Sequence, residues 1–146
     1  MRIWQFFDYY PDGGGCPITD WYNAQDVEIR AKFDAAVADL EITENWDDPE
    51  LKSFGVLSRK HAGLAQVKFY VIRRGKKRHH RAIGRWRRDA REFIFLIGFQ
   101  KSGRTTIPPN ALTEAVRLLG ELELQRGEIH EHNDDMAEAG EGQTLP

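Results

Sequence analysis

Cysteine is almost absent from this sequence, which contains only Cys16 among its 146 residues. One cysteine cannot form an internal disulfide, and it excludes a metal site built from several thiolates. Long apolar stretches are also missing, since the longest run, residues 93–99, is far shorter than the roughly 20 residues of a membrane-spanning helix. The apolar residues that follow Met1 are too few for a signal peptide. We therefore expect a cytoplasmic protein that has no membrane partner.

Several motifs that mark well-known catalytic sites are missing as well. The chain has no G-x-G-x-x-G, no Walker phosphate-binding loop, no G-x-S-x-G and no H-E-x-x-H. His79 and His80 are adjacent, but they lie in a basic run whose positive charge would repel a metal ion. We therefore expect neither a metal nor a cofactor.

Acidic residues are scarce in the middle of the chain, although the formal net charge of the whole chain is only −2. Residues 52–104 contain 16 of the 21 Lys and Arg residues, but only Asp89 and Glu92 among the 23 acidic ones. The middle segment therefore has a formal charge of +14, and the rest of the chain has −16. Such segregation is typical of proteins that bind a polyanion.

Hydrophobic periodicity predicts both helices and strands. Residues 26–40 have apolar side chains at Ile29, Phe33, Val37 and Leu40, a spacing typical of an amphipathic helix. Period-two alternation in the middle segment is typical of strands joined by tight turns. The other predicted elements are a strand over 2–9, a helix entry over 16–22, strands over 64–72, 81–86 and 93–99, and a helix over 112–122.

The order of these elements predicts an α+β fold. It has an N-terminal strand and two helices, then an antiparallel three-stranded meander and a C-terminal helix. Helices would cover one face of the sheet, and basic side chains would cover the other. A chain of this length predicts one domain, which we place at residues 1–127. Residues 128–146 are acidic and poor in large apolar side chains, so we expect a disordered tail there.

The basic residues of the predicted meander are candidate nucleic-acid contacts. Lys and Arg side chains neutralise phosphates, and interleaved aromatic residues such as Trp86 can stack on unpaired bases. Solvated turns and a protected edge strand would also be basic, but acidic residues would then be expected among them. The same surface could instead bind an acidic protein segment. The predicted RNA-binding residues are Arg73, Arg74, Lys76, Lys77, Arg78, Arg85, Arg87, Arg88 and Arg104.

Four short segments carry a family resemblance. Residues 63–69 read Gly-Leu-Ala-Gln-Val-Lys-Phe, residues 81–83 read Arg-Ala-Ile, residues 93–101 read Phe-Ile-Phe-Leu-Ile-Gly-Phe-Gln-Lys, and 108–109 are prolines. Together they resemble toxins of the RelE/ParE superfamily, in particular the phage-derived HigB-like branch, over about residues 2–124. The resemblance implies a RelE-like fold. It also implies the toxin of a type II toxin–antitoxin pair, an mRNA interferase that cuts mRNA on the ribosome without a metal.

The resemblance also implies catalytic residues. Lys68, Arg81 and Lys101 match basic positions of the family, and His80 is a further candidate base. In the implied reaction the ribose 2′-hydroxyl attacks the adjacent phosphate. That step needs a base, cationic stabilisation and a proton for the leaving oxygen. Lys68 could be the base because neighbouring cations lower a lysine pKa.

The sequence also departs from the family pattern. Gln66 stands where many members have a charged residue, Gln100 replaces the first of two lysines, and no tyrosine follows Tyr70. These departures favour an alternative, a non-catalytic phage-derived module that binds nucleic acid or protein on the same scaffold. For the toxin itself, the implied partners are mRNA on the ribosome and a cognate helix-turn-helix antitoxin.

Overall fold

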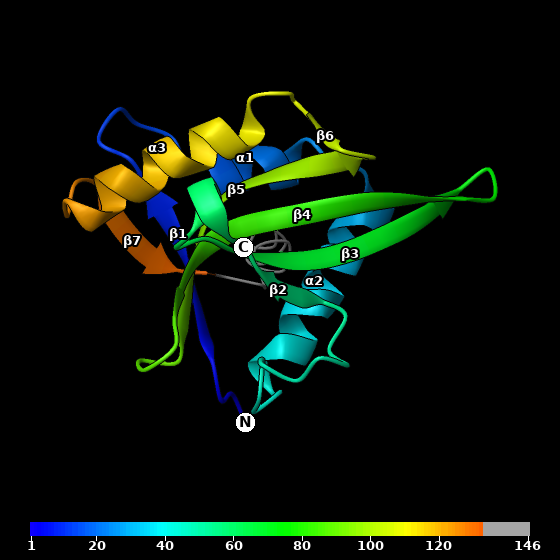
Figure 1. Cartoon of the computed structure of the whole chain (residues 1–146), viewed down its shortest axis with the longest axis horizontal. Helices are drawn as coiled ribbons and strands as arrows, with labels where there is room; N and C mark the ends of the chain where they lie inside the picture. The colour runs from blue at the N-terminus through cyan, green and yellow to red at the C-terminus, as the bar shows by residue number, and fades with distance from the viewer. Residues whose placement is uncertain (133–146) are drawn as a thin grey trace, which may run out of the picture.

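A computed structural model describes residues 1–132, which form one mixed β-sheet with helices on both faces (Figure 1). The strands are β1 (Gln5–Tyr10), β2 (Phe54–Val56), β3 (Ala65–Arg73), β4 (Lys76–Arg87), β5 (Glu92–Ser102), β6 (Thr105–Ile107) and β7 (Glu128–Glu131). The helices are α1 (Pro17–Asn23), α2 (Val27–Glu41) and α3 (Ala111–Glu123), with a 3₁₀ turn at Arg59–His61. Residues 133–146, most of the predicted tail, lie outside the described residues.

The sheet has seven strands, with β2-β3-β4-β5-β1-β7 in order and β6 paired to the C-terminal end of β5. Strand β1 runs parallel to β5, and the other neighbouring pairs are antiparallel. The predicted fold class is therefore wrong. The molecule does not have the RelE-like arrangement of one strand, two helices, a three-stranded meander and a last helix. Its sheet is larger and mixed, and a strand follows the last helix.

Three strands were not predicted from the sequence, because their residues show little alternation of apolar and polar side chains. Strands β2 and β6 have three residues each, which is too short for a period-two pattern. Strand β7 contains two glutamates and begins the segment that we expected to be a disordered tail. It is held in the sheet instead by pairing with β1, where Ile129 lies opposite Tyr9.

Helices α1 and α2 cover one face of the sheet through an aromatic core. Phe33 of α2 packs against Phe69 of β3 and Phe95 of β5, with ring centroids 6.0 and 5.3 Å apart. Gly98 of β5 lies under α1, where a Cβ atom would overlap the Trp21 ring. The two helices are therefore fixed to this face by contacts with β3 and β5.

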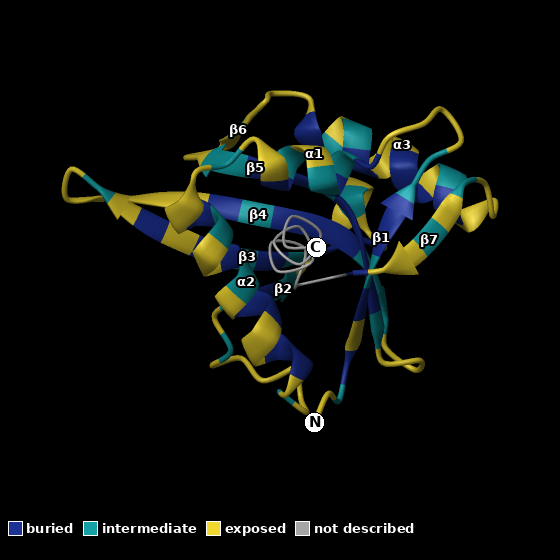
Figure 2. Ribbon diagram, turned by 180° about the vertical axis from the view of Figure 1, so that it is seen from behind, coloured by how far each residue is buried: buried dark blue, intermediate teal, exposed yellow. Residues whose placement is uncertain are grey.

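Helix α3 covers only part of the opposite face. Its residues Leu118 and Leu122 are buried together with Ile83, Ile94 and Leu96 of the sheet. The β3–β4 hairpin continues past α3 and projects from the body of the molecule, with an exposed tip (Figure 1, Figure 2). The outer half of this hairpin is thus a sheet face that α3 leaves open.

Candidate nucleic-acid interface

The open half of the β3–β4 hairpin has cationic and aromatic side chains on one face. Pairing of β3 with β4 places Lys68 opposite Arg81 and Tyr70 opposite His79, and β5 places Lys101 opposite His79. These five side chains lie on the same side of the sheet because paired and alternate residues share a face. The structure therefore brings together three of the four predicted catalytic residues. Together with Lys77, which lies opposite Ile72, the five form the cationic face.

Ion pairs distinguish two groups among the predicted RNA-binding and catalytic residues. Four have acidic partners, namely Arg73 with Asp26 at 2.8 Å, Arg85 with Glu123 at 3.8 Å, Arg87 with Glu92 at 3.7 Å and Arg88 with Asp47 at 2.7 Å. Within residues 1–132, no acidic side chain lies within 4.0 Å of a side-chain nitrogen of Lys68, Lys77, Arg81 or Lys101. An acidic partner offsets the charge of an arginine, so the paired group contributes less to a positive potential than the cationic face does.

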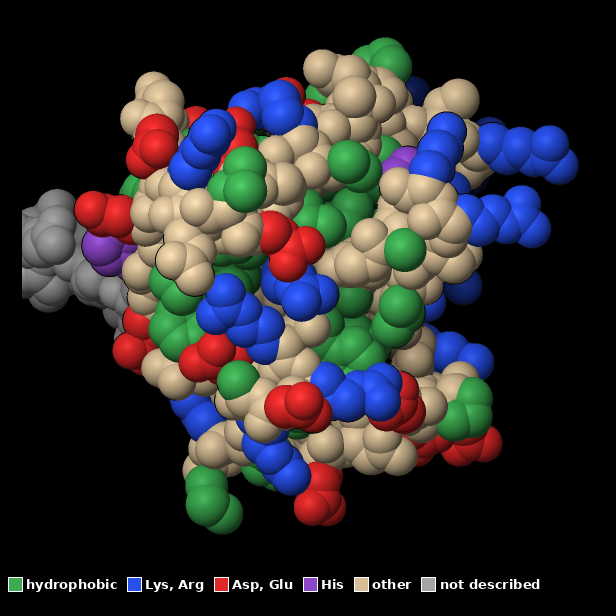
Figure 3. All heavy atoms as spheres, turned by 60° about the vertical axis from the view of Figure 1, so that its left-hand side comes forward, with side chains coloured by type: hydrophobic (Ala, Val, Ile, Leu, Met, Phe, Trp, Pro, Cys, Tyr) green, Lys and Arg blue, Asp and Glu red, His purple; other side chains and the backbone are tan. Residues whose placement is uncertain are grey.

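The remaining predicted contacts lie around the hairpin tip and a neighbouring turn. Arg74 is in the β3–β4 turn, Lys76 and Arg78 begin β4, and Arg104 is in the turn between β5 and β6. In the space-filling view, Lys and Arg side chains project from one edge, whereas acidic and basic side chains are intermixed over the rest of that face (Figure 3). Among residues 1–132 on this face, basic side chains without acidic neighbours are thus confined to that edge.

Arg81 is half-buried and has a donor that is not used. Its Nη1 donates to the main-chain oxygen of His80 at 3.1 Å, whereas its buried Nε has no hydrogen-bond partner. Burial lowers the pKa of this guanidinium, which nevertheless remains charged at physiological pH. A buried donor without a partner costs free energy, and a bound phosphate oxygen would supply the missing acceptor.

The ammonium group of Lys68 lies over the backbone of β2. A Cβ atom on Gly55 would be 3.3 Å from Lys68 Nζ, so glycine leaves room for this side chain. The main-chain N–H of Lys68 donates to the oxygen of Ser53 at 2.7 Å. Burial lowers the pKa of Lys68, and charge repulsion from Arg81 and Lys52 lowers it further. A lowered pKa raises the fraction of neutral amine, which is what a general base needs.

The pKa of Lys68 gives a direct test of this geometry. We expect NMR titration of labelled lysine side chains to give Lys68 a pKa below the usual value of a lysine side chain. Arg81→Gln should raise the pKa of Lys68, because it removes a nearby cation. Lys60→Gln is the matched control, since Lys60 is not among the charges that lower this pKa. A Lys68 pKa at the usual lysine value, or one unchanged by Arg81→Gln, would contradict the assignment.

His79 belongs to the cationic face but was not among the predicted site residues. Partial desolvation lowers its pKa, and Arg81, Lys77 and Lys101 lower it further by repulsion. Its imidazole is therefore a proton acceptor near neutral pH. Strand alternation could have identified it, because a side chain two residues before Arg81 must lie on the same face.

His80 lies on the opposite face, so its predicted role as a base is corrected. It is 3% exposed, and its ring stacks on Phe69 with centroids 5.4 Å apart. Burial lowers its pKa, and its Nδ1 is buried without a hydrogen-bond partner. A substrate bound at Lys68 and Arg81 would be separated from His80 by the sheet itself.

Tyr70 provides an exposed aromatic ring beside the cations. It is 43% exposed, and Nζ of Lys77 lies 4.6 Å from its ring centroid. Exposed aromatic rings next to cations are the usual platform on which unpaired bases stack. A groove of about 860 Å³ runs along this part of β3 and is bounded on its other side by α2.

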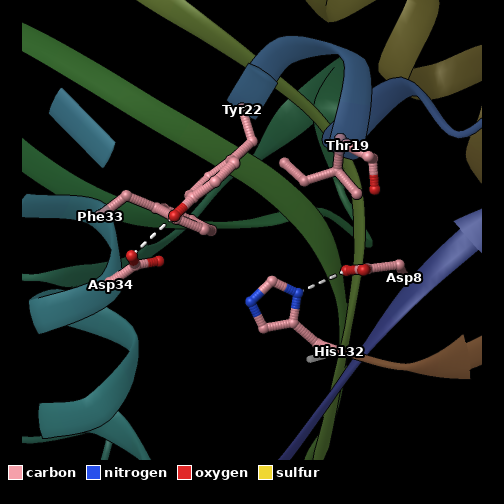
Figure 4. Close-up of a pocket in the computed structure, with 7 residues that line it drawn as sticks. Asp8, Thr19, Tyr22, Phe33, Asp34 and His132 are labelled. Atoms are coloured by element: carbon pink, nitrogen blue, oxygen red, sulfur yellow. Dashed lines mark hydrogen bonds and ion pairs between the residues drawn. The ribbon is translucent and has the colours of Figure 1, made fainter. Parts of the chain in front are cut away.

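A second group of polar residues lies between the sheet and the first two helices (Figure 4). His132 Nδ1 and Asp8 Oδ1 are 2.8 Å apart, and the Tyr22 hydroxyl donates to Asp34 Oδ2 at 2.7 Å. The cavity between them has about 10 Å³, which is room for about one water molecule. A substrate cannot enter such a space. We interpret the group as a structural contact that fixes the chain after β7 to β1.

We expect His132→Ala to lower the free energy of unfolding by about 2–4 kcal/mol, because Asp8 would be left buried without its partner. His130→Ala is the matched control in the same segment. The His130 side chain is exposed, so its loss should cost less than about 1 kcal/mol. Urea denaturation measures both, and equal losses would contradict the structural role of the His132–Asp8 contact.

A scan against protein-family models and searches of curated proteins and of solved structures find no match to this chain. Within residues 1–132, no helix is both long enough and apolar enough to cross a membrane. The same residues contain no group of three or more His, Cys, Asp or Glu side chains that could hold a metal ion.

Proposed function

We propose that the cationic face binds RNA and cleaves it as an endoribonuclease that needs no metal ion. The observation that carries this proposal is the pair Lys68 and Arg81, which lie directly opposite each other on neighbouring strands. Neither has an acidic partner within residues 1–132, and Arg81 has a buried donor that is not used. A phosphate group would satisfy both residues, and Tyr70 next to them can stack on a base.

These side chains supply the groups that the reaction needs. The ribose 2′-oxygen attacks the adjacent phosphorus, and the bond to the 5′-oxygen breaks, which leaves a 2′,3′-cyclic phosphate and a 5′-hydroxyl. Neutral Lys68 accepts the 2′-hydroxyl proton, as its lowered pKa allows. Arg81 donates hydrogen bonds to the pentacoordinate phosphate, where negative charge accumulates. Lys101, whose Nζ donates to the main-chain oxygen of Gly103 at 2.8 Å, supplies the proton that the leaving 5′-oxygen takes.

For the biological role, the proposal is a toxin of a type II toxin–antitoxin pair that cleaves mRNA on the ribosome and is neutralised by a helix-turn-helix antitoxin. The motifs at residues 63–69 and 93–101 support it, and so does the placement of Lys68, Arg81 and Lys101 on one face. Fold topology gives it no support, because the sheet is not the RelE-like one that the resemblance implied.

Primer extension tests this function on two substrates. Free RNA is incubated with the protein in the presence and in the absence of a chelator, and mRNA is translated with and without the protein in ordinary magnesium buffer. We expect cleavage of at least one substrate, and cleavage of mRNA only during translation would favour the toxin. Binding of RNA without cleavage of either substrate would favour the non-catalytic module. Cleavage of free RNA that stops in chelator would contradict the proposed chemistry.

A further inference from the structure

The outer edge of β3 is open where the hairpin leaves the body. Strand β2 pairs with only residues 65–67 of β3, and Ser53 accepts the next main-chain N–H, that of Lys68. From Tyr70 to Ile72, no strand within residues 1–132 pairs with this edge, because β4 lies on the other side. Beyond Lys68, this edge of β3 therefore faces a groove and not another of the described strands.

The main chain of Tyr70 and Ile72 points into this groove. Antiparallel strands alternate between residues whose N–H and C=O groups face the partner and residues whose groups face away. Lys68 N–H bonds to Ser53, away from β4, so the groups of Tyr70 and Ile72 also face away from β4. The groove thus presents N–H donors and C=O acceptors in alternation, which is the pattern that a further strand completes.

The walls of the groove leave space for such a strand. On one side, Tyr70 and Ile72 are exposed by 43% and 59%, an unusual exposure for apolar edge side chains. On the other side, Ala35 and Ala36 of α2 line the groove and leave it wide because their side chains are small. The groove is also lined by more basic than acidic residues, since Lys32, Lys52, Lys68, Lys77 and Arg81 outnumber Glu28 and Asp39.

We propose that this edge docks an extended acidic polypeptide segment of another protein, which adds to the sheet as a strand beside β3. Its carboxylates would face Lys68, Lys77 and Arg81, and its small apolar side chains would lie over Ala35 and Ala36. RNA does not fit the edge itself, because phosphate oxygens accept hydrogen bonds but do not donate them. A second copy that docks through its own β3 edge fits poorly, because the two cationic faces would then lie side by side.

The docked segment covers the side chains that we propose contact RNA, so polypeptide and RNA exclude each other. The docking stands without the proposed RNA chemistry, and only this competition rests on it. Strand addition here would therefore regulate access to the cationic face, whereas the fold would stay the same.

The test uses a capped synthetic peptide of alternating Glu and Val, bound to the full chain without RNA and followed by fluorescence anisotropy. Two control peptides have alternating Lys and Val, or the parent sequence with N-methyl groups on alternate amides. Ile72→Pro removes one edge N–H, and proline is tolerated on edge strands. Ile72→Thr is the matched variant that keeps this N–H and a β-branched side chain.

We expect Ile72→Pro to weaken binding of the Glu-Val peptide about tenfold or more, and Ile72→Thr to leave it within about threefold. The N-methylated and Lys-Val peptides should bind at least about tenfold more weakly than the parent peptide. RNA affinity of Ile72→Pro should not change, which separates this result from a failure of the RNA proposal. Equal binding of the parent and N-methylated peptides would reduce the contact to charge alone and overturn strand addition. Peptide binding that appears only after deletion of residues 133–146 would make the chain's own acidic segment the occupant and overturn the proposed partner.

Discussion

Replacing Arg81 with Ala should lower the rate of RNA cleavage by about 10²–10³-fold, the usual loss when one donor to a transition state is removed. Arg81 is the one member of the cationic face whose guanidinium is half-buried with an unused Nε donor. Because it is already positioned, it can stabilise the developing charge without reorganisation. Rates with saturating RNA should fall more than RNA affinity does, since phosphate binding is shared with Lys68, Lys77 and Lys101.

Arg88→Ala is the matched control for Arg81→Ala. Both remove one guanidinium from β4 or the turn that follows it, but Arg88 is already paired with Asp47 at 2.7 Å. We expect Arg88→Ala to change the cleavage rate less than about threefold. Circular dichroism and urea denaturation should show both variants folded. Equal cleavage by parent and Arg81→Ala would show that Arg81 has no part in the chemistry.

RNA affinity should fall steeply with salt, with a log–log slope of about −0.7 for each phosphate contacted on a single strand. If Lys68, Lys77, Arg81 and Lys101 each contact one phosphate, the slope is about −2.8, which is about a 50-fold loss of affinity between about 50 and 200 mM salt. The chemical reason is the release of counterions from the RNA when protein cations replace them.

Two variants, each with four substitutions, distinguish cations that have no acidic partner within residues 1–132 from cations that have one. Serine at Lys68, Lys77, Arg81 and Lys101 should make the slope shallower by about 2.8. Serine at the paired residues should change it much less, because their charge is already partly offset; these residues are Arg73, Arg85, Arg87 and Arg88. Filter binding over a salt series measures both. The two variants would have equal slopes if ion pairing had no influence on RNA contact.

The central strands and the cationic face could be predicted from the sequence because their signals are local. Alternation in 64–72 placed Lys68 away from Val67 and Phe69, and β3 has this arrangement. A continuous apolar run such as 93–99 is typical of a strand covered on both faces, and in β5 residues 93–96 are fully buried. Adjacent strands with short turns must pair, so Arg81 had to lie near Lys68.

The remaining strands could not be predicted, because their pairing joins residues far apart in the chain. Strand β7 is acidic and gains its stability from contact with β1 and from the His132–Asp8 contact. No local pattern of residues 128–132 indicates this partner. His79 could have been chosen over His80 as the histidine of the site. The predicted strand begins at residue 81, and extending its alternation back by two residues places His79 on the same face as Arg81.

The most direct test is the cleavage of a labelled RNA, either free in chelator or translated on ribosomes in magnesium buffer, with the product ends identified by mass spectrometry. A second RNA has one 2′-deoxy residue at the cleaved position. We expect a 2′,3′-cyclic phosphate and a 5′-hydroxyl from the first RNA, and no cleavage at the 2′-deoxy position of the second. Lys68→Ala and Arg81→Ala should each yield these products at least about 10²-fold more slowly. Products with a 3′-hydroxyl and a 5′-phosphate, or cleavage at the 2′-deoxy position, would contradict attack by the 2′-hydroxyl at the cationic face.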